Sequence, residues 1–311
     1  MAFSIAVASG KGGTGKTTVA VSLFNILAST AGRTVQLVDC DVEEPNDGLF
    51  FPAKQLINRE QVHKTVPVID TEKCTFCRRC ADYCEFNAIV VIPTAGYAAV
   101  NNSLCHSCGA CLVACEEDAI SEVQDPIGDI TNYDTGAGGT LAEGRLLIGS
   151  AMQTMLIREL KKRVEDQRTR AGETDAATNP GSHGKQQAFS IEIYDAPPGT
   201  SCPVVETFAD TDYVVLVAEP TPFGLHDLKL TVAILQEMEK PFGVVVNKAG
   251  IGEREIYRYL ADEKIVLLGE IPYSRTFAQE YAKGTIHDRL PDGFRGALEQ
   301  IANGVMKYAT P

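Results

Sequence analysis

The sequence predicts an α/β protein with a doubly wound, mainly parallel sheet into which a second, smaller domain is inserted. Six short apolar runs alternate with segments of helical periodicity, a pattern typical of parallel strands joined by helices on both faces of a sheet. A glycine-rich segment directly follows the first run, and two cysteine-rich segments interrupt the alternation after the second. The six expected strands cover residues 3–8, 34–38, 188–194, 213–218, 242–247 and 265–268.

The composition is typical of a globular protein with an acidic surface. The chain has 311 residues, 44% of them hydrophobic, and a formal net charge of −13. This balance disfavours direct binding to nucleic acid, because phosphate backbones are also negative. No apolar run approaches the roughly 20 residues that cross a bilayer, and no signal peptide is evident, so we expect neither membrane insertion nor secretion. Most of the ten cysteines lie in two tight groups, which favours metal binding in a reducing cytoplasm over disulfides.

The first expected strand leads into a phosphate-binding loop. "FSIAVASG", residues 3 to 10, runs into Gly10 to Thr17, which fits G-x-x-x-x-G-K-[ST] at every fixed position, and a helical pattern follows. Such a loop directs backbone N–H groups at nucleotide phosphates, while Lys16 reaches the β- and γ-phosphates and the Thr17 hydroxyl ligates Mg²⁺. A glycine-rich turn with a chance lysine is the alternative. The residues expected to bind ATP here are Gly12, Gly13, Thr14, Gly15, Lys16, Thr17 and Thr18.

A second lysine, Lys11, lies inside this loop. The segment K-G-G-T-G-K-T resembles the deviant phosphate loop of the MinD/ParA/Mrp family of P-loop ATPases. The resemblance implies hydrolysis of ATP to ADP and phosphate. It also implies a nucleotide-sandwich dimer, in which Lys11 reaches the phosphates of the partner chain and acts in catalysis together with Lys16. The partner would be a second copy of this chain or a related ATPase.

Two further segments resemble the switches of the same family. "TVQLVDCD", residues 34 to 41, looks like switch I, which implies that Asp41 orients or activates the attacking water and that Asp39 lies near the Mg²⁺ shell. The alternative is that these aspartates only cap the end of a strand. "IEIYDAPPGT", residues 191 to 200, looks like switch II, in which Asp195 would hold Mg²⁺ through water and the Gly199 N–H would sense the γ-phosphate.

Two late segments resemble the part of the family fold that binds the base. "FGVVVNKAG", residues 242 to 250, looks like the base-reading strand, which implies that Asn247 contacts adenine. "LLGEIPYS", residues 267 to 274, looks like the late strand whose proline, here Pro272, lies along the base. The phosphate loop, both switches and Asn247 all follow carboxyl ends of expected strands, which is where open parallel sheets bind ligands.

The clustered cysteines form an internal repeat. Both runs, residues 74 to 84 and 105 to 115, have the spacing C-x₂-C-x₂-C-x₃-C and resemble those of two-cluster bacterial ferredoxins. In such proteins the fourth cysteine of each run ligates the other cluster. The resemblance therefore implies two [4Fe–4S] clusters, one held by Cys74, Cys77, Cys80 and Cys115 and the other by Cys105, Cys108, Cys111 and Cys84. Glu85 and Glu116 stand where these ferredoxins have proline, and two zinc sites are the competing interpretation.

The domain boundaries follow from these segments. We expect an inserted, ferredoxin-like α+β domain at residues 65–125 and a MinD-like P-loop ATPase domain at residues 1–64 and 126–311. Residues 132–144 are glycine-rich and are expected to form a flexible loop on re-entry into the ATPase domain. Residues 165–187 are polar without periodicity and are expected to be a mobile linker. The amphipathic C-terminal segment is expected to pack against the sheet.

Two cysteines lie outside the runs. Cys40 is expected to point into the core, because side chains alternate along a strand and its neighbours Asp39 and Asp41 face the nucleotide. Cys202 is expected to be a small buried residue. The alternative for Cys202 is a bridging metal or redox role, as in nitrogenase iron protein, a relative in the superfamily. None of the five histidines pairs with another ligand at metal spacing.

Together these features predict an ATP-binding and ATP-hydrolysing iron–sulfur protein. In the leading hypothesis, the nucleotide state gates electron transfer by two [4Fe–4S] clusters, or their interactions with a partner. This activity would serve the assembly or reduction of a metallocluster or redox partner protein. One alternative is a carrier of the Mrp type, which passes a labile cluster to a target. The other is a positioning switch like MinD or ParA, in which the cysteine-rich domain is only a docking surface.

Overall fold

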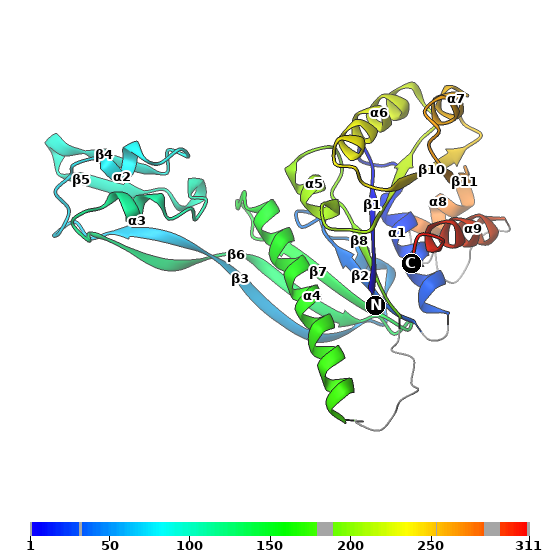
Figure 1. Cartoon of the computed structure of the whole chain (residues 1–311), viewed down its shortest axis with the longest axis horizontal. Helices are drawn as coiled ribbons and strands as arrows, with labels where there is room; N and C mark the ends of the chain where they lie inside the picture. The colour runs from blue at the N-terminus through cyan, green and yellow to red at the C-terminus, as the bar shows by residue number, and fades with distance from the viewer. Residues whose placement is uncertain (1, 31–32, 179–188, 253, 283–292, 310–311) are drawn as a thin grey trace. The chain divides into compact units, whose positions relative to one another are not determined.

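The computed structural model describes residues 2–30, 33–178, 189–252, 254–282 and 293–309 (Figure 1). The chain divides into two compact units. The first comprises Met1–Arg59, Ile130–Arg145 and Ile157–Pro311, and the second comprises Glu60–Asp129 and Leu146–Leu156. Both cysteine runs belong to the second unit, and the phosphate loop belongs to the first.

A nine-stranded, mainly parallel sheet confirms the predicted α/β class. Its order is β11-β10-β9-β1-β8-β2-β7-β6-β3, and the neighbouring strands from β11 to β7 are parallel. All six strands expected from the apolar runs are present. They are β1 (Ala2–Ala8), β2 (Arg33–Asp39), β8 (Phe189–Asp195), β9 (Tyr213–Ala218), β10 (Phe242–Ala249) and β11 (Leu267–Pro272).

Helices cover both faces of the sheet in the first unit (Figure 1). α1 (Lys16–Ala28) and α9 (Phe294–Met306) share a buried core with Ile191 and Ile193 of β8, which confirms that the C-terminal segment packs against the sheet. Because side chains alternate along a strand, Glu192 points to the opposite face, where it pairs with Arg168 of α4 (Gln153–Thr178). The remaining helices of this unit are α5 (Cys202–Phe208), α6 (Pro222–Glu237), α7 (Glu255–Asp262), α8 (Arg275–Ala282) and the 3₁₀ turn η1 (Asp47–Phe50).

The expectation of a flexible loop at residues 132–144 is wrong. Most of this segment lies in β6 (Ile120–Asp134) and β7 (Thr140–Leu146), which join the sheet beside β2 together with β3 (Gln55–Ile69). A turn closes the β6–β7 hairpin, since the backbone N–H of Thr135 donates to the Gly139 carbonyl at 3.1 Å and its hydroxyl donates to the same oxygen at 2.6 Å. The glycines of this segment are needed for the tight turn between the two strands. Their high number therefore does not indicate a long flexible loop.

The expectation of a linker at residues 165–187 is also wrong for its first part. α4 continues to Thr178, and residues 179–187 lie outside the described residues. Ion pairs support the polar helix: Arg163 lies 3.5 Å from Glu159 at i,i+4 spacing, and Arg168 lies 3.5 Å from Glu165 at i,i+3 spacing. No helix in the described ranges is both long enough and apolar enough to span a bilayer.

The second unit consists of two similar halves. Each cysteine run contains one short helix, α2 (Arg79–Asp82) or α3 (Ala110–Ala114), and each run is followed by a strand, β4 (Ile89–Ile92) or the start of β6. β4 pairs in antiparallel fashion with β5 (Tyr97–Val100). Small clusters of buried aliphatic residues and cysteines form the core, in which Val66 is fully buried beside Cys105. The turn η2 (Pro93–Ala95) connects the halves, and η3 (Asn102–Leu104) directly precedes the second cysteine run.

Candidate functional site

The phosphate loop turns into α1 at a position that only glycine can occupy. Gly15 is the N-cap of α1 and has a φ of 95°, in the left-handed region. A Cβ at this position would lie 2.2 Å from Nδ2 of Asn247. No side chain caps the helix, so its first backbone N–H groups are available to an anion. Lys16, the first residue of the helix, is buried here.

Asn247 fastens the loop to the sheet. At the carboxyl end of β10, its Nδ2 donates to the Thr14 carbonyl at 2.7 Å, and its Oδ1 accepts the Lys248 N–H at 2.9 Å. Lys248 Nζ donates to the Gly13 carbonyl at 3.0 Å. The structure thus brings Asn247 against the phosphate loop, and Pro272 lies on the neighbouring strand, opposite Ala249. Contact of either residue with adenine stays a prediction.

Three buried carboxylates lie beside the loop. Asp39 and Asp195 end adjacent strands in direct register, and Asp47 begins η1. Asp39 accepts backbone N–H bonds from Asp41, Asn46 and Asp47 at 3.1, 2.8 and 3.0 Å. The Thr17 hydroxyl donates to Oδ2 of Asp195 at 2.7 Å. Both oxygens of Asp47 and Oδ1 of Asp195 are buried, and no amide, hydroxyl or cationic donor of any described residue reaches them. The carboxyl groups of Asp47 and Asp195 lie close enough to share a proton when one of them is protonated.

This concentration of acids is unfavourable without a cation. Burial raises the pKa of Asp39, of Asp47 and of Asp195 above the ordinary aspartate value. The negative charge of Asp195 raises the first two further, while Lys16 lowers the pKa of Asp47 and of Asp195. Buried carboxylate oxygens without donors, next to a threonine hydroxyl, are the donor set that Mg²⁺ prefers. Asp47 was not recognised in the sequence, because only the fold brings η1 to these strand ends.

Asp41 lies at the same edge of the sheet but is only half-buried. Burial raises the pKa of its carboxyl to about 6, and the nearby Lys16 ammonium works in the opposite direction. Gly199, expected to sense the γ-phosphate, has a φ of 98° and donates its N–H to the Ser9 carbonyl at 3.1 Å. The structure therefore brings the segment expected to be switch II against Ser9, which follows β1 and precedes the phosphate loop.

Glu219 is a site residue that sequence reasoning missed. It follows β9 at the carboxyl edge of the sheet, and its Oε2 lies 3.4 Å from Nζ of Lys11. Its Oε1 accepts a hydrogen bond from Lys248, so one carboxylate holds two lysines beside the phosphate loop. Within a single chain, Lys11 therefore has an anionic partner. The position of Glu219 directly after a parallel strand was the signal available in the sequence.

The eight clustered cysteines gather in two sets of four. One cavity is lined by Cys74, Cys77, Cys80 and Cys115, and a second by Cys84, Cys105, Cys108 and Cys111. In each set the third cysteine of the run is buried and the second is exposed. Each set takes three sulfurs from one run and one from the other, which is the grouping expected from the ferredoxin resemblance. Burial raises the pKa of Cys80 and takes that of Cys111 to about 11, so their thiolates need a cationic partner.

The two halves repeat at the level of single backbone angles. Positive φ values occur at Phe76, Arg78 and Asn87, and again 31 residues later at Ser107, Gly109 and Asp118. The Phe76 N–H donates to the Cys74 sulfur at 3.4 Å, and the Ser107 N–H donates to the Cys105 sulfur at the same distance. A left-handed backbone conformation is energetically unfavourable for residues other than glycine. At Phe76 and Ser107 this conformation directs the backbone N–H toward a cysteine sulfur.

Reciprocal hydrogen bonds tie the halves together. The Asp70 N–H donates to the Ala119 carbonyl at 2.8 Å, and the Asn101 N–H donates to the Ala88 carbonyl at 2.7 Å. Residues 70 and 101 are equivalent in the 31-residue repeat, and so are residues 88 and 119. The two bonds are therefore the same contact, related by an internal pseudo-twofold axis. This symmetry places the fourth cysteine of each run beside the cavity of the other.

Of the remaining cysteines, one prediction is confirmed and one is wrong. Cys40 is fully buried, as expected. Cys202 is exposed at the first position of α5, whereas the next two residues, Pro203 and Val204, are buried. His106 is exposed and stacks on Phe86, with ring centroids 3.8 Å apart. His183 and His287 lie outside the described residues.

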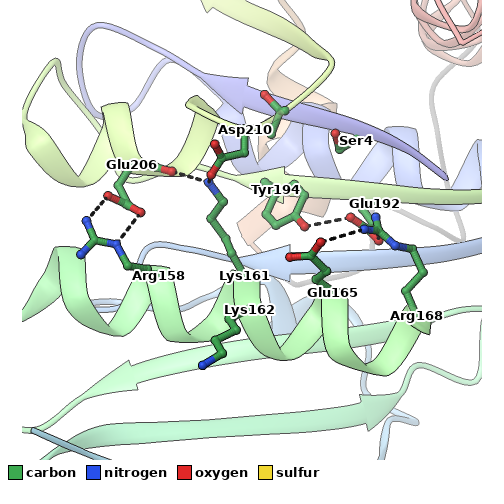
Figure 2. Close-up of a pocket in the computed structure, with 11 residues that line it drawn as sticks. Ser4, Arg158, Lys161, Lys162, Glu165, Arg168, Glu192, Tyr194, Glu206 and Asp210 are labelled. Carbon is green, nitrogen blue, oxygen red and sulfur yellow. Dashed lines mark hydrogen bonds and ion pairs between the residues drawn. The ribbon is translucent and has the colours of Figure 1, made fainter. Parts of the chain in front are cut away.

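A separate polar cavity of about 380 Å³ lies where α4 meets β8 and α5 (Figure 2). Its acids are paired: Glu206 with Arg158 at 2.8 Å, Asp210 with Lys161 at 3.1 Å, and the buried Glu192 with Arg168 at 3.0 Å. Lys162 points away from this group (Figure 2). Because these acidic side chains are paired with basic side chains of α4, the cavity is best explained as the place where ion pairs hold α4 against its neighbours.

Comparisons with known proteins agree with this geometry. The family model described as "CbiA: CobQ/CobB/MinD/ParA nucleotide binding domain" matches residues 5–286. Two uncharacterized proteins of Methanocaldococcus jannaschii are similar in sequence. MJ0579 is 28% identical over 308 residues, which is 97% of each chain. MJ0578 is 30% identical over 247 residues, which is 79% of this chain and 78% of that protein.

Solved structures show the same fold at low sequence identity. The cell division ATPase MinD of Pyrococcus furiosus has a TM-score of 0.56 and 18% identity, with 99% of both chains covered. The septum site-determining protein MinD of Pyrococcus horikoshii, solved in complex with Mg-ADP, has a TM-score of 0.57 and 19% identity, with 99% of this chain and 98% of that chain covered.

Proposed function

This chain belongs to the CobQ/CobB/MinD/ParA nucleotide-binding family and has the P-loop ATPase fold of MinD, and from that premise we propose that it is an ATP-hydrolysing iron–sulfur protein. In this proposal the nucleotide state gates electron transfer by two [4Fe–4S] clusters, or their interactions with a redox or metallocluster partner. The crossed grouping of the cysteines around two cavities, in a chain of a nucleotide-binding family, is the observation that carries it.

The first unit would bind Mg-ATP. The uncapped N-terminus of α1 and Lys16 would hold the phosphates, and Thr17 would turn its hydroxyl from Asp195 toward the metal. The buried oxygens of Asp47 and Asp195 that lack donors support a divalent cation at this edge of the sheet. Mg²⁺ would supply charge neutralisation on the β- and γ-phosphates.

Hydrolysis would follow in-line attack of water on the γ-phosphorus. Asp41 would orient this water, and its raised pKa suits a group that accepts a proton near neutral pH. Lys16 and the partner chain's copy of Lys11 would stabilise the negative charge that moves onto the leaving phosphate oxygens. For this, Lys11 must leave Glu219, which makes dimer formation and phosphate binding parts of one step.

The second unit would hold the clusters. A [4Fe–4S] cluster is ligated by thiolates at separate corners, so its ligands surround a cavity instead of converging on a point. The N–H groups of Phe76 and Ser107 that point at sulfurs would stabilise the charge of bound thiolates. Such clusters would supply one-electron redox chemistry.

Iron and sulfide counts on the anaerobically prepared full chain test the cluster part of the proposal. We expect about eight irons and eight sulfides per chain for two [4Fe–4S] clusters, with an EPR signal after reduction by dithionite. A preparation that takes up about four irons or fewer contradicts the two-cluster assignment. Iron that leaves on ATP addition, from a site that needs Cys202, would instead support a cluster carrier.

The gating part needs a comparison between nucleotide states. We expect cluster potentials or partner affinity to differ between ADP and a non-hydrolysable ATP analogue, and the difference to vanish in Lys16→Ala, which cannot bind the phosphates. Identical values in both states would mean that the two units work independently. If Cys77→Ser and Cys108→Ser left partner binding unchanged, the positioning switch would become the better hypothesis.

A further inference from the structure

Lys64 occupies a core position in the cysteine-rich unit. It lies on β3 between Val62 and Val66, and all three side chains point inward because strand residues two apart share a face. Lys64 is 4% exposed. Residues 60–129 and 146–156 are all described, and Lys64 is the one charged side chain among them that is buried. Its position is therefore unusual for a lysine.

The environment of Lys64 lacks an anion. Its Nζ donates to the Asn102 carbonyl at 2.6 Å and to the Cys105 carbonyl at 3.0 Å. No carboxylate of any described residue lies within ion-pair distance of it. Burying an ammonium without a counter-charge is strongly unfavourable, and carbonyl acceptors offset that cost only in part. A negative group in its surroundings would offset the rest.

The second cavity is the place where such a group would lie. Cys105, whose carbonyl accepts from Lys64, lines this cavity together with Cys84, Cys108 and Cys111. Thr65, the next residue on β3, also lines it, and its carbonyl accepts the Ser107 hydroxyl at 2.6 Å. Lys64 is thus attached to the segment that presents the sulfurs.

The first cavity has no equivalent charge. The pseudo-twofold relates Lys64 to position 95, which is an exposed alanine. Each cavity has one exposed glutamate at its rim, Glu117 in the first and Glu122 in the second. Arg78 also lines the first cavity, but its side chain is 54% exposed and lies 3.5 Å from Asp82. Water screens an exposed pair strongly, whereas a buried ammonium acts through a low dielectric.

We propose that Lys64 is the internal counter-ion of the metal site formed by Cys84, Cys105, Cys108 and Cys111, and that it makes this site, rather than its symmetry mate, the preferred location of an added electron. The inference rests on the proposed two clusters. One electron from an external reductant takes a four-thiolate [4Fe–4S] site from a net charge of about −2 to about −3. Lys64 stabilises this added charge at one site and not at the other.

Potentiometric EPR titration of the iron-loaded full chain with dithionite tests the inference. Lys64→Gln keeps a hydrogen-bond donor for the two carbonyls and removes the charge. We expect it to lower the reduction equilibrium constant of one cluster at least tenfold, which is about 59 mV for one electron, and to leave the other unchanged. Lys64→Arg should retain most of the wild-type value. The control is Lys73→Gln, which removes an exposed lysine directly before Cys74, and neither potential should move.

Ligand variants assign the affected cluster. The Lys64→Gln shift should persist in a Cys77→Ser background, where the first site is damaged, and disappear in a Cys108→Ser background. An equal shift of both clusters, no shift, or a shift that survives Cys108→Ser overturns the role of Lys64. If Lys64→Gln does not load iron, Lys64→Arg decides, because it must load and keep the wild-type asymmetry between the clusters. A wild-type chain that takes up no iron would contradict the proposed function itself, which separates the two failures.

Discussion

Gly15 shows how one residue type can decide the shape of the phosphate loop. Its φ of 95° strains any residue with a Cβ, and that Cβ would lie 2.2 Å from Nδ2 of Asn247, which would have to move. Motif matching predicts a glycine here from sequence alone. The reason for it, a contact with a residue more than 200 positions later, becomes visible only in the fold.

Replacing Gly15 with alanine should impair ATP binding. The added Cβ would collide with Asn247 and force the loop away from the conformation that aims its amides at the phosphates, so we expect at least about tenfold weaker affinity by calorimetry. Gly296→Ala in α9 is the matched control, since its Cβ meets open space. It should leave ATP affinity unchanged and stabilise the helix by about 0.5–1 kcal/mol. Equal ATP affinity in both variants would contradict the steric argument.

Glu219→Gln should lower the free energy of unfolding and, at the same time, make dimer formation easier in the presence of ATP. The variant removes the partially buried anion shared by Lys11 and Lys248, so we expect the free energy of unfolding without nucleotide to fall by about 1–3 kcal/mol. Because Lys11 then loses the anionic partner that Glu219 provides, dimer formation should need less ATP, as measured by light scattering across an ATP titration.

Glu237→Gln, at the exposed end of α6, is the control for Glu219→Gln and should change neither quantity. If Glu219→Gln raised the ATP concentration needed for dimer formation, Glu219 would be a positioning residue for Lys11 and not its competitor.

Residues in local motifs were predictable, and residues joined by the fold were not. Lys16, Thr17 and the cysteine runs belong to short patterns whose spacing matches their chemistry. Asp47, Glu219 and Lys64 owe their roles to contacts between segments far apart in the chain. Cys202 was wrongly expected to be buried, because the orientation of the first turn of α5 has no signature in the sequence.

At the scale of elements, α4 is a helix that ion pairs hold against neighbouring elements. The polar sequence of its later part, from residue 165, suggested a linker. Its basic residues nevertheless have partners on β8, on α5 and directly after α5 (Figure 2). Those partners are 24 to 49 residues away in the sequence, so no local pattern could reveal them. The strands β3, β6 and β7 were missed for a related reason, since polar and glycine residues interrupt their apolar positions, and each strand is recognised only from its pairing in the sheet.

The ion pairs of α4 should differ in strength according to burial. Arg168→Ala leaves Glu192, 4% exposed in its side chain, without its cation, and we expect a loss of about 3 kcal/mol in the free energy of unfolding. Arg158→Ala breaks a two-pronged pair with Glu206, but Arg158 is 66% exposed, so the loss should be about 0.5–1 kcal/mol. Chemical denaturation of both variants measures the difference. Equal losses would mean that burial of Glu192 contributes little.

At the scale of the whole molecule, two units of different character share one chain. The family match and the mainly parallel sheet account for the nucleotide-binding unit, and that much could be predicted from alternating apolar runs and one loop motif. The division of the chain into units depends on where long strands pass from one to the other, which apolar periodicity cannot locate.

The exchange of cysteines between halves makes a further prediction. Cys80→Ser and Cys115→Ser should damage the same cluster although they lie in different runs, while Cys84→Ser should damage the other, together with Cys111→Ser. EPR of the reduced, iron-loaded variants distinguishes the two signals, and each variant should lose one of them. If Cys80→Ser and Cys84→Ser instead removed the same EPR signal, each run would hold its own cluster.

The pseudo-twofold has a consequence for how the chain matures. Each half contributes a cysteine to its neighbour's cavity, so in the proposed two-cluster protein neither half could complete its own inorganic core alone. Insertion of the first cluster would immobilise the cysteine that the second awaits, so loading should be cooperative and half-filled chains scarce. A cell that supplies iron sparingly would then hold some molecules fully charged and the rest empty, rather than a uniform population at intermediate content.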